Sequence, residues 1–382
     1  MIEPFSLPFS QSAVDDLRDR LYRTRWPDKI PGSSWMYGFD RQCLQEICRY
    51  WIDTFDWKAQ VERLSVVSHF RFHSSDGNIH FIHERGKGPA PIPLVLTHGW
   101  PGSFVEMLHI LPLLTDPAAH GADPADAFDV VIPSLPGFGF SDQPAAPGMN
   151  SFRIAGLWVE LMQALGYARF AAQGGDIGAG LSTALGLRHA GHLIGIHLNY
   201  IPGSYRPHLE GTAKPSAAEQ KFLADAARWY EENGAYAHVQ ATRPQTAAYG
   251  LNDSPAGLAA WILEKFRNWS DCDGDLYASF SPDELLSNVT LYWMTQTIHS
   301  SFRLYYENRR APLHLEKEAF VHIPCAIAHF PKEILFPPRE WVERGYNVQR
   351  WTEMPRGGQF AAAEQPELLA EDIRAFFRFA RT

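Results

Sequence analysis

The short segment Gly174–Gly178 combines a carboxylate with flanking glycines. The apolar run Phe170–Ala172 precedes it and a helix-favouring stretch, Ala179–Arg188, follows, so the pattern predicts a strand, a sharp turn and a helix. Small residues let such a turn adopt a strained backbone and present its central side chain, here Asp176. A carboxylate is ionised at neutral pH and can attack an electrophilic carbon without a base. The product is an ester that must then be hydrolysed. Ordinary turns share this pattern, so other parts of the chain have to support the interpretation.

Alternating strands and helices surround this turn from about residue 92 onwards. This alternation is typical of an α/β fold in which helices cover a mostly parallel sheet. The predicted strands are Leu94–Leu96, Val130–Ile132, Phe170–Ala172, Ile194–Leu198, Cys325–Ala328 and Val348–Trp351. The predicted helices of this part are Ser103–Leu114, Ile154–Leu165, Ala179–Arg188 and Glu367–Phe379.

Two other regions lack this alternation. Residues 1–90 carry short helical patterns, at Val14–Tyr22 and Arg41–Trp51, and we expect them to wrap around the rest of the molecule. Residues 202–310 have no strand signal, and their helical patterns are Ala217–Glu232, Leu258–Phe266 and Asp283–Tyr306. The sequence therefore predicts an N-terminal wrapping segment (1–90), an α/β core (91–201 and 311–382) and a helical cap (202–310).

Composition excludes several classes of function. The 382 residues carry 43 acidic and 34 basic side chains, a net charge of −9 that argues against nucleic acid as a partner. The 4 cysteines form no C-x-x-C pair, which favours reduced thiols. The N-terminus resembles no signal peptide, and no apolar run approaches the ~20 residues that span a bilayer. We expect a soluble, cytoplasmic protein without a membrane anchor; whether it forms a homo-oligomer is left open.

Further motifs carry a resemblance to a known family. The loops His98–Gly102 and Pro133–Ser141 each follow a predicted strand. Together with the Asp176 turn, they resemble the epoxide hydrolase branch of the α/β-hydrolase superfamily. Other segments extend the resemblance over essentially the whole chain and favour the microsomal-type epoxide hydrolases, which have an N-terminal meander. These segments are Arg25–Asp28, Leu251–Leu258, Leu291–Trp293, Phe330–Ile334 and Pro355–Ala362.

The resemblance implies an α/β-hydrolase fold and a small-molecule epoxide substrate, with no metal or organic cofactor. It implies that Asp176 attacks the less hindered epoxide carbon. Tyr236 and Tyr305 would hydrogen-bond the epoxide oxygen and protonate it as the ring opens, because a phenol can donate to a developing alkoxide. Tyr306 is the alternative if the register differs by one residue.

The resemblance also implies the remaining parts of the site. The backbone N–H groups of Trp100 and Ile177 would form an oxyanion hole. Glu333 would orient the catalytic histidine of the family.

One position departs from the family. Its late loop carries a histidine general base where this chain has Gln359. An amide can position a water molecule but has no basic lone pair near neutral pH. Alkylation of Asp176 should survive, whereas hydrolysis of the ester should slow by roughly 10²–10⁴-fold, or about 3–5 kcal/mol. We therefore predict conversion of an apolar or aryl epoxide to a vicinal diol, with an ester intermediate that persists.

Gln359 has three open explanations: an introduced substitution, a natural variant with slow turnover, or a second base that replaces histidine. The otherwise intact set of residues favours an introduced substitution. His329, beside the Glu333 loop, is the best candidate for a second base, whereas His98 is expected to be structural. His299, in a cap helix, could line the pocket.

Two other functions are compatible with the sequence. A haloalkane dehalogenase also uses an aspartate in this turn, and Trp100 could donate to a halide. A non-catalytic ligand-binding relative would keep the aromatic pocket, and Gln359 supports that reading.

Overall fold

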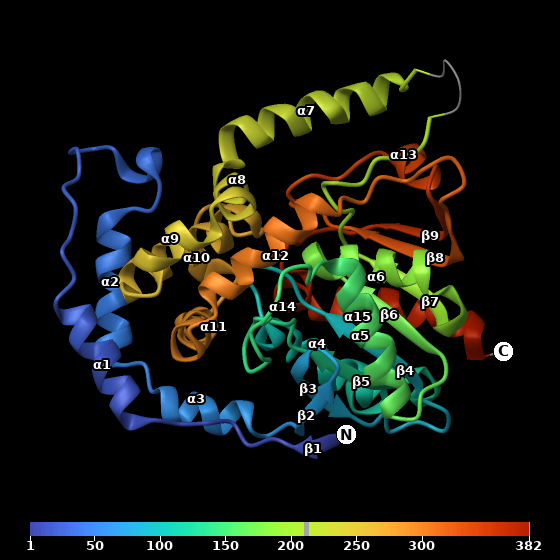
Figure 1. Cartoon of the computed structure of the whole chain (residues 1–382), viewed down its shortest axis with the longest axis horizontal. Coiled ribbons are helices and arrows are strands. Elements are labelled where there is room, and N and C mark those ends of the chain that lie inside the picture. Colours follow the sequence, from blue (N-terminus) through green and yellow to red (C-terminus); the bar gives the residue numbers. More distant parts are fainter. Residues whose placement is uncertain (210–213, 382) are drawn as a thin grey trace.

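The computed structural model describes residues 1–209 and 214–381, and a nine-stranded sheet forms its centre (Figure 1). The strand order is β1-β2-β3-β5-β4-β6-β7-β8-β9. The strands are β1 (Ile2–Pro4), β2 (His69–Ser74), β3 (Gly77–Glu84), β4 (Ile92–Thr97), β5 (Phe128–Pro133), β6 (Phe170–Gly174), β7 (Leu193–Leu198), β8 (Val321–His329) and β9 (Tyr346–Glu353). From β5 to β9 all neighbours are parallel, which confirms the predicted α/β fold.

Helices cover both faces of the parallel part of the sheet. In Figure 1, α5 (Ser151–Ala164) and α6 (Asp176–Arg188) lie in front of it, and α4 (Ile110–Thr115) and α15 (Pro366–Phe377) lie behind it. The central strands are buried on both faces, which explains their nearly continuous apolar sequences. In the register of β4 and β6, Thr97 is paired with Gly174, so the loops that follow these strands lie side by side.

The predicted helix Ser103–Leu114 is wrong as a single element. Ser103 does act as an N-cap, accepting a hydrogen bond from the Val105 N–H, but the turn that follows is a 3₁₀ helix, Phe104–Met107. The α-helix α4 starts only at Ile110. Pro112 explains the break, since it has no N–H to donate to the Leu108 carbonyl and its ring would collide with that group in a continuous helix.

The N-terminal segment contributes both helices and strands. The helices α1 (Gln11–Tyr22), α2 (Arg41–Asp53) and α3 (Trp57–Leu64) lie along the helical region, and Arg20 pairs with Asp253 at 2.6 Å. The sequence analysis did not predict β1, β2 and β3. These strands extend the sheet in antiparallel fashion, with β3 paired to β5.

The helical region contains α7 (Ala217–Asn233), α8 (Ala235–Thr242), α9 (Pro244–Leu251), α10 (Pro255–Trp269), α11 (Pro282–Thr295) and α12 (Ile298–Arg310). The predicted helix Asp283–Tyr306 is therefore two helices. The break falls at Gln296, whose φ of 53° lies in the left-handed region and ends α11. The reversal allows α12 to pack against α8 and α9. Two short helices, α13 (Arg339–Glu343) and α14 (Ala361–Glu364), complete the fold. Within the described residues, no helix has the length and apolar character needed to cross a membrane.

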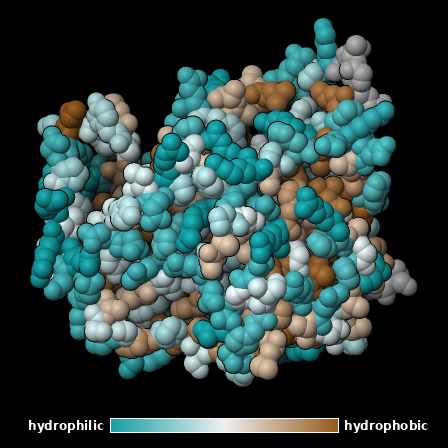
Figure 2. Space-filling model, in the orientation of Figure 1, coloured by the Kyte–Doolittle hydropathy of each residue, from teal (hydrophilic) through white to brown (hydrophobic). Residues whose placement is uncertain are grey.

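Helix α7 lies along the upper edge of the molecule in Figure 1. The face of the molecule seen in this orientation is largely hydrophilic, but apolar side chains gather along and beneath α7 (Figure 2). There, Phe222, Leu223 and Trp341 line a pocket of about 130 Å³ between α7 and α13.

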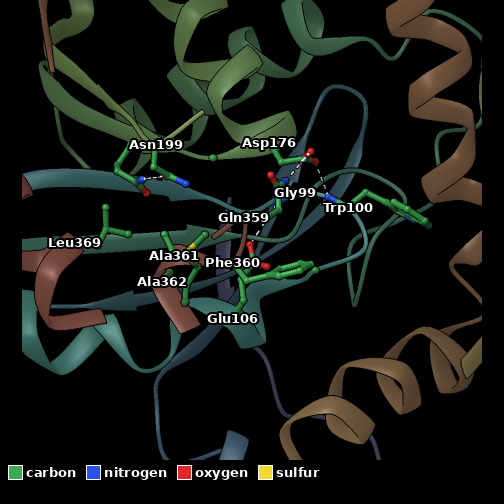
Figure 3. A pocket seen from close by; sticks show the side chains of 14 residues that line it. Gly99, Trp100, Glu106, Asp176, Asn199, Gln359, Phe360, Ala361, Ala362 and Leu369 are labelled. Atoms are coloured by element: carbon green, nitrogen blue, oxygen red, sulfur yellow. Dashed lines mark hydrogen bonds between the residues drawn. The ribbon is translucent and has the colours of Figure 1, made fainter. Parts of the chain in front are cut away.

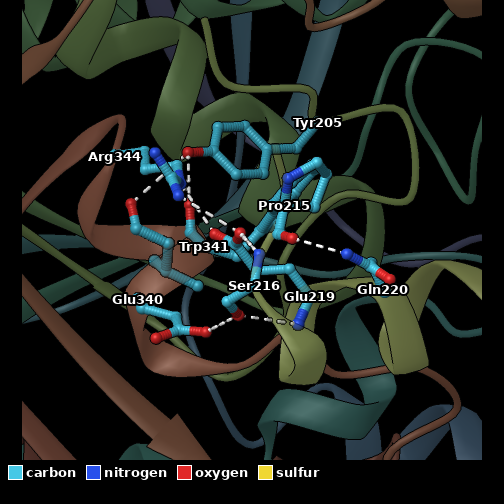
Figure 4. Close-up of polar contacts among 9 residues, drawn as sticks. Tyr205, Pro215, Ser216, Glu219, Gln220, Glu340, Trp341 and Arg344 are labelled. Carbon is cyan, nitrogen blue, oxygen red and sulfur yellow. Dashed lines mark hydrogen bonds and ion pairs between the residues drawn. The ribbon is translucent and has the colours of Figure 1, made fainter. Parts of the chain in front are cut away.

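A buried ion pair fixes the start of α7 against α13 (Figure 4). The fully buried Glu219 accepts hydrogen bonds from Arg344 Nε at 2.6 Å and Nη2 at 3.1 Å. Glu219 also accepts from the Ser216 N–H at 2.7 Å, closing a capping box at the start of α7. These donors, Arg344 first, lower the pKa of Glu219, so the carboxylate is charged at neutral pH.

We expect Arg344→Met to destabilise the protein by about 1–3 kcal/mol, because Glu219 would keep a buried charge without its partner. We expect a smaller loss of stability than for a fully buried ion pair, because the Arg344 side chain is one-third exposed. Denaturant unfolding at pH 7 measures the change. Arg339→Met is the matched control: Arg339 forms an exposed pair with Glu343 on the same helix, and its loss should change stability by less than about 0.5 kcal/mol. Equal effects of the two substitutions would contradict the assignment.

Candidate active site

Asp176 lies at the turn between β6 and α6, with a φ of 47°. This conformation is unfavourable for a residue with a side chain, and it costs on the order of 1–3 kcal/mol. The close packing of the turn requires glycine at two neighbouring positions. A Cβ atom at Gly178 would overlap the Thr97 carbonyl, and one at Gly174 would overlap Gly178 itself. The predicted strand–turn–helix around Asp176 is therefore confirmed, and the turn presents the carboxylate at the carboxyl end of the sheet.

Donors from two loops hold the carboxylate of Asp176 (Figure 3), and the backbone of Ile177, at the start of α6, stabilises it as well. The Trp100 N–H donates to Oδ1 at 2.9 Å, and Gln359 Nε2 donates to Oδ2 at 3.1 Å. The Ile177 N–H is the third donor. Enclosure by protein raises the pKa of Asp176 above its ordinary value, and the hydrogen bonds from Trp100, Ile177 and Gln359 oppose that rise. The structure thus brings together four of the residues expected to form the site.

A cavity of about 520 Å³ opens in front of Asp176. Tyr236 and Tyr305 both line it, with ring centroids 6.1 Å apart in an edge-to-face arrangement. Burial raises the pKa of both phenols, so they stay protonated as donors. Tyr306 is not part of this cavity and stacks on Arg310 instead. The geometry favours Tyr305 over its neighbour.

Aromatic packing fixes the position of Tyr236. The indole of Trp100 stacks on its ring with a centroid distance of 5.4 Å. On the cap side, the buried Lys265 places its Nζ 4.9 Å from the centre of the Tyr236 ring and forms an ion pair with Glu264. A cation over the ring stabilises an electron-rich phenolate more than a neutral phenol. Lys265 could not be found from the sequence, because its contact with the Tyr236 ring depends on how the cap helices pack against one another.

Gln359 and Glu333 lie on the two late loops, which meet through a backbone bridge between Lys332 and Gly358. Gln359 is buried, and its N–H donates to the Trp269 carbonyl at 2.9 Å. In the part of the chain that the structure describes, the Oε1 atom of Gln359 and the Oε2 atom of Glu333 have no hydrogen-bond partner. The other oxygen of Glu333 accepts from the Ile334 N–H at 2.8 Å. Burial raises the pKa of Glu333 well above its ordinary range, which favours the neutral acid.

The candidate histidines all lie outside the residues around Asp176. His98 is buried beneath the loop after β4, with Nδ1 on the Gly99 carbonyl and Nε2 accepting from the Leu135 N–H, and burial lowers its pKa to about 4. His329 pairs with Glu353 at 2.6 Å. His299 contacts Gln143 and lines a separate surface groove. The placement of His329 and His299 argues against either as a replacement base.

A second, much smaller chamber lies on the other side of Asp176. Its volume is about 20 Å³, and it is lined by Glu106, Gln173, Asn199 and Gln359 as well as Asp176. The sequence analysis did not select Glu106. The signal available was a carboxylate within one turn of the His98–Gly102 loop, and such a position is common for surface charges.

The family models and relatives agree with this architecture. An "Epoxide hydrolase N terminus" model matches residues 2–107, and an "alpha/beta hydrolase fold" model matches residues 92–247. A putative epoxide hydrolase from Stigmatella aurantiaca is 45% identical, covering 100% of this chain and 86% of the relative. Epoxide hydrolase 1 from Sus scrofa is 40% identical, covering 98% of this chain and 88% of the relative.

Solved structures show the same similarity. Juvenile hormone epoxide hydrolase from Bombyx mori superimposes with a TM-score of 0.85 at 31% identity, covering 100% of this chain and 94% of the other. Aspergillus niger epoxide hydrolase superimposes with a TM-score of 0.87 at 30% identity, covering 99% and 96%. The fold is thus an α/β-hydrolase fold, as predicted. The chain belongs to the epoxide hydrolases.

We expect Gly99→Ala to disable the site without unfolding the protein. A methyl group at this position would overlap Cβ and Oδ1 of Asp176 and push the carboxylate away from the Trp100 N–H. A displacement of about 1 Å costs on the order of 10²-fold in rate. The measurement is the rate of styrene oxide consumption. Gly156→Ala on α5 is the control, since a Cβ there meets nothing within 4 Å and the rate should not change. Equal rates for both variants would contradict the assigned geometry.

Proposed function

We propose that this chain opens apolar or aryl epoxides by attack of Asp176, through a covalent aspartyl ester. One observation carries the proposal: Asp176 lines a cavity of about 520 Å³ whose lining also includes the neighbouring side chains of Tyr236 and Tyr305. A nucleophile and two proton donors around one space suit the opening of a strained ether ring. Membership of the epoxide hydrolases supports the same reaction class.

In the first half-reaction, an Asp176 oxygen forms a bond to an epoxide carbon as the C–O bond of the ring breaks. The phenols donate hydrogen bonds to the epoxide oxygen, and one of them transfers its proton, leaving a phenolate. Lys265 lies over the Tyr236 ring and stabilises negative charge there. The product is a hydroxyalkyl ester of Asp176.

In the second half-reaction, water attacks the carbonyl carbon of that ester. The carbonyl oxygen becomes an oxyanion, and the N–H groups of Trp100 and Ile177 stabilise it. In the free enzyme the same two groups stabilise the Asp176 carboxylate, where the Trp100 N–H donates to Oδ1. Attack requires that a base accept a proton from water. Gln359, which occupies the position of the family's histidine in the resembling loop, donates to Asp176 and is not a base. The second half-reaction is therefore the slow one.

The lining of the cavity supports an apolar or aryl substrate. Phe152, Tyr200, Trp229, Tyr230 and Leu335 contribute aromatic and aliphatic surface. Such surface favours substrates by burial of apolar area rather than by charge.

Haloalkane dehalogenation is less well supported by the geometry. The indole N–H of Trp100 is buried without a partner, as a halide donor would be, but the Tyr236 ring stacks on this indole and Trp100 does not line the large cavity. Two phenols beside the nucleophile fit a developing alkoxide better than a halide.

The first prediction of this mechanism is a persistent covalent adduct. Incubation with styrene oxide should increase the intact mass by one substrate, with the label on the peptide that contains Asp176. Asp176→Asn should prevent the adduct, provided that mass analysis shows no conversion of Asn back to Asp. Reversible binding without a mass increase would instead support a non-catalytic ligand-binding protein.

The second prediction concerns Gln359→His. An imidazole at this position can take a proton from water, so multiple turnover should rise by about 10²–10⁴-fold and the adduct should no longer accumulate. Steady-state diol production and intact mass measure the two effects. Thermal melting checks that the variant is folded, and intact mass checks that its chain is uncleaved. A variant that still accumulates the adduct at the original rate would show that residue 359 does not face the hydrolytic water.

A further inference from the structure

The chamber behind Asp176 is separate from the large cavity that contains the phenols. Asp176 lines both spaces, so the two spaces adjoin the same residue. The chamber has a volume of about 20 Å³. A space that admits a water centre needs about 10–15 Å³, so this chamber has room for one water molecule.

Two buried acceptors mark the chamber as a polar site. Gln173 and Gln359 both line it, and they are 1% and 6% exposed. Within residues 1–209 and 214–381, the Oε1 atom of each has no hydrogen-bond partner. Their amide nitrogens are committed to other groups, Gln173 Nε2 to Asn199 and Gln359 Nε2 to Asp176. Buried acceptors of this kind require a donor, and a water molecule supplies two.

The carboxyl group of Glu106 completes the wall of the chamber (Figure 3). Its Oε1 lies 3.4 Å from the Gly99 N–H. The loop leaves space for the group because Gly102 has no side chain: a Cβ atom there would overlap Glu106 Oε2. Among the side chains that line the chamber, Glu106 and Asp176 carry the carboxyl groups, and Asp176 is the group that becomes esterified.

We propose that Glu106 is the general base of the hydrolytic half-reaction: a water molecule in the chamber donates one O–H to the Glu106 carboxylate, which accepts that proton, and its other O–H to the unpaired amide oxygen of Gln173 or Gln359. This inference rests on the aspartyl ester of the proposed function. The water oxygen bonds to the carbonyl carbon of the ester as one O–H bond breaks and its proton moves to the Glu106 carboxylate. The tetrahedral intermediate then collapses, the bond to the diol oxygen breaks, and that oxygen takes the proton from Glu106. Asp176 is left as a neutral acid, whose proton returns to the phenolate formed in the first half-reaction.

The charge on Asp176 determines when Glu106 can act as a base. Burial and, less strongly, the nearby Asp176 raise the pKa of Glu106 to about 8. Formation of the ester removes the charge on Asp176, so the pKa of Glu106 falls and the carboxylate becomes more populated. Among the residues that the structure describes, Tyr292 also interacts electrostatically with Glu106. Glu106 also lines an outer groove that contains the His109–Glu284 pair, which gives protons a path to solvent.

The test compares the decay of the styrene oxide adduct in the parent chain and in Glu106→Gln, by quench and intact mass. The amide oxygen can still accept from the Gly99 N–H, so adduct formation should be unchanged, whereas adduct decay should slow by at least about tenfold. In the parent, decay should accelerate as the pH rises and should level off below the pKa of about 8 that Glu106 has in the free enzyme, because the base must lose its proton; in Glu106→Gln this rise should disappear. A parent chain that hydrolyses the ester too fast to accumulate it should accumulate it after this substitution.

Two further variants separate a base from a structural role. His329→Gln, which removes the alternative base, should leave decay unchanged. In the Gln359→His background, Glu106→Gln should have little effect, because the imidazole then accepts the proton; a purely structural role would slow both backgrounds equally. Glu106→Asp, which keeps the base, should retain part of the decay rate if Glu106→Gln proves unstable.

The outcomes distinguish this inference from the proposed function. Adducts that form normally and decay equally fast in the parent and in Glu106→Gln would overturn the inference alone, as would equal slowing in both backgrounds. A parent chain that produces neither adduct nor diol would overturn the proposed function and the inference together.

Discussion

The structure depends on the hydrogen bonds that converge on the Asp176 carboxylate. The Trp100 N–H comes from the loop after β4 and the Ile177 N–H from the start of α6, and the register of β4 and β6 makes these loops neighbours. The backbone at Asp176 has a positive φ, which would not persist without surrounding contacts. Glycines at 99, 174 and 178 let the two loops approach closely enough for these bonds. Preorganised backbone donors of this kind need no rearrangement when negative charge develops on the same oxygen.

The sequence was sufficient for the parts of the molecule that repeat a strong local pattern. Strands β4 to β9 are short apolar runs buried on both faces, and each was located within its observed bounds. Strands β2 and β3 were missed because they mix His, Arg and Asn with apolar residues, and they become strands by pairing with one another and with β5. The two helices predicted as continuous break where a local residue overrides the periodicity, at Pro112 and at Gln296.

The same distinction applies to the candidate site. Asp176 stood out from its neighbours, because the glycines around it are needed for a strained turn, but the motifs elsewhere in the chain were required to assign it as a nucleophile. Tyr236, Tyr305 and Glu333 were selected only through resemblance, since nothing local separates them from other tyrosines and acids. Glu106 and Lys265 could not be found from local sequence. Glu106 lies in the 3₁₀ helix Phe104–Met107, whose direction depends on the break before α4, and Lys265 contacts Tyr236 from another cap helix. Residues of this type become visible only when the loops and the cap are placed in space.

In the proposed mechanism, the two spaces beside Asp176 give the two half-reactions different surroundings. An electrophile in the large cavity meets aromatic rings and two phenol donors, which favour an apolar substrate and an incipient alkoxide. The chamber behind it is lined by amides and a carboxyl group and has room for little more than water. One carboxyl group that borders both spaces can therefore receive the substrate from one side and water from the other, without a change in fold. Gln359 lies on the water side and donates to Asp176, so its amide stabilises the nucleophile as an anion and leaves the phenol side of the site unaltered. A change at this single position can thus separate ester formation from ester hydrolysis.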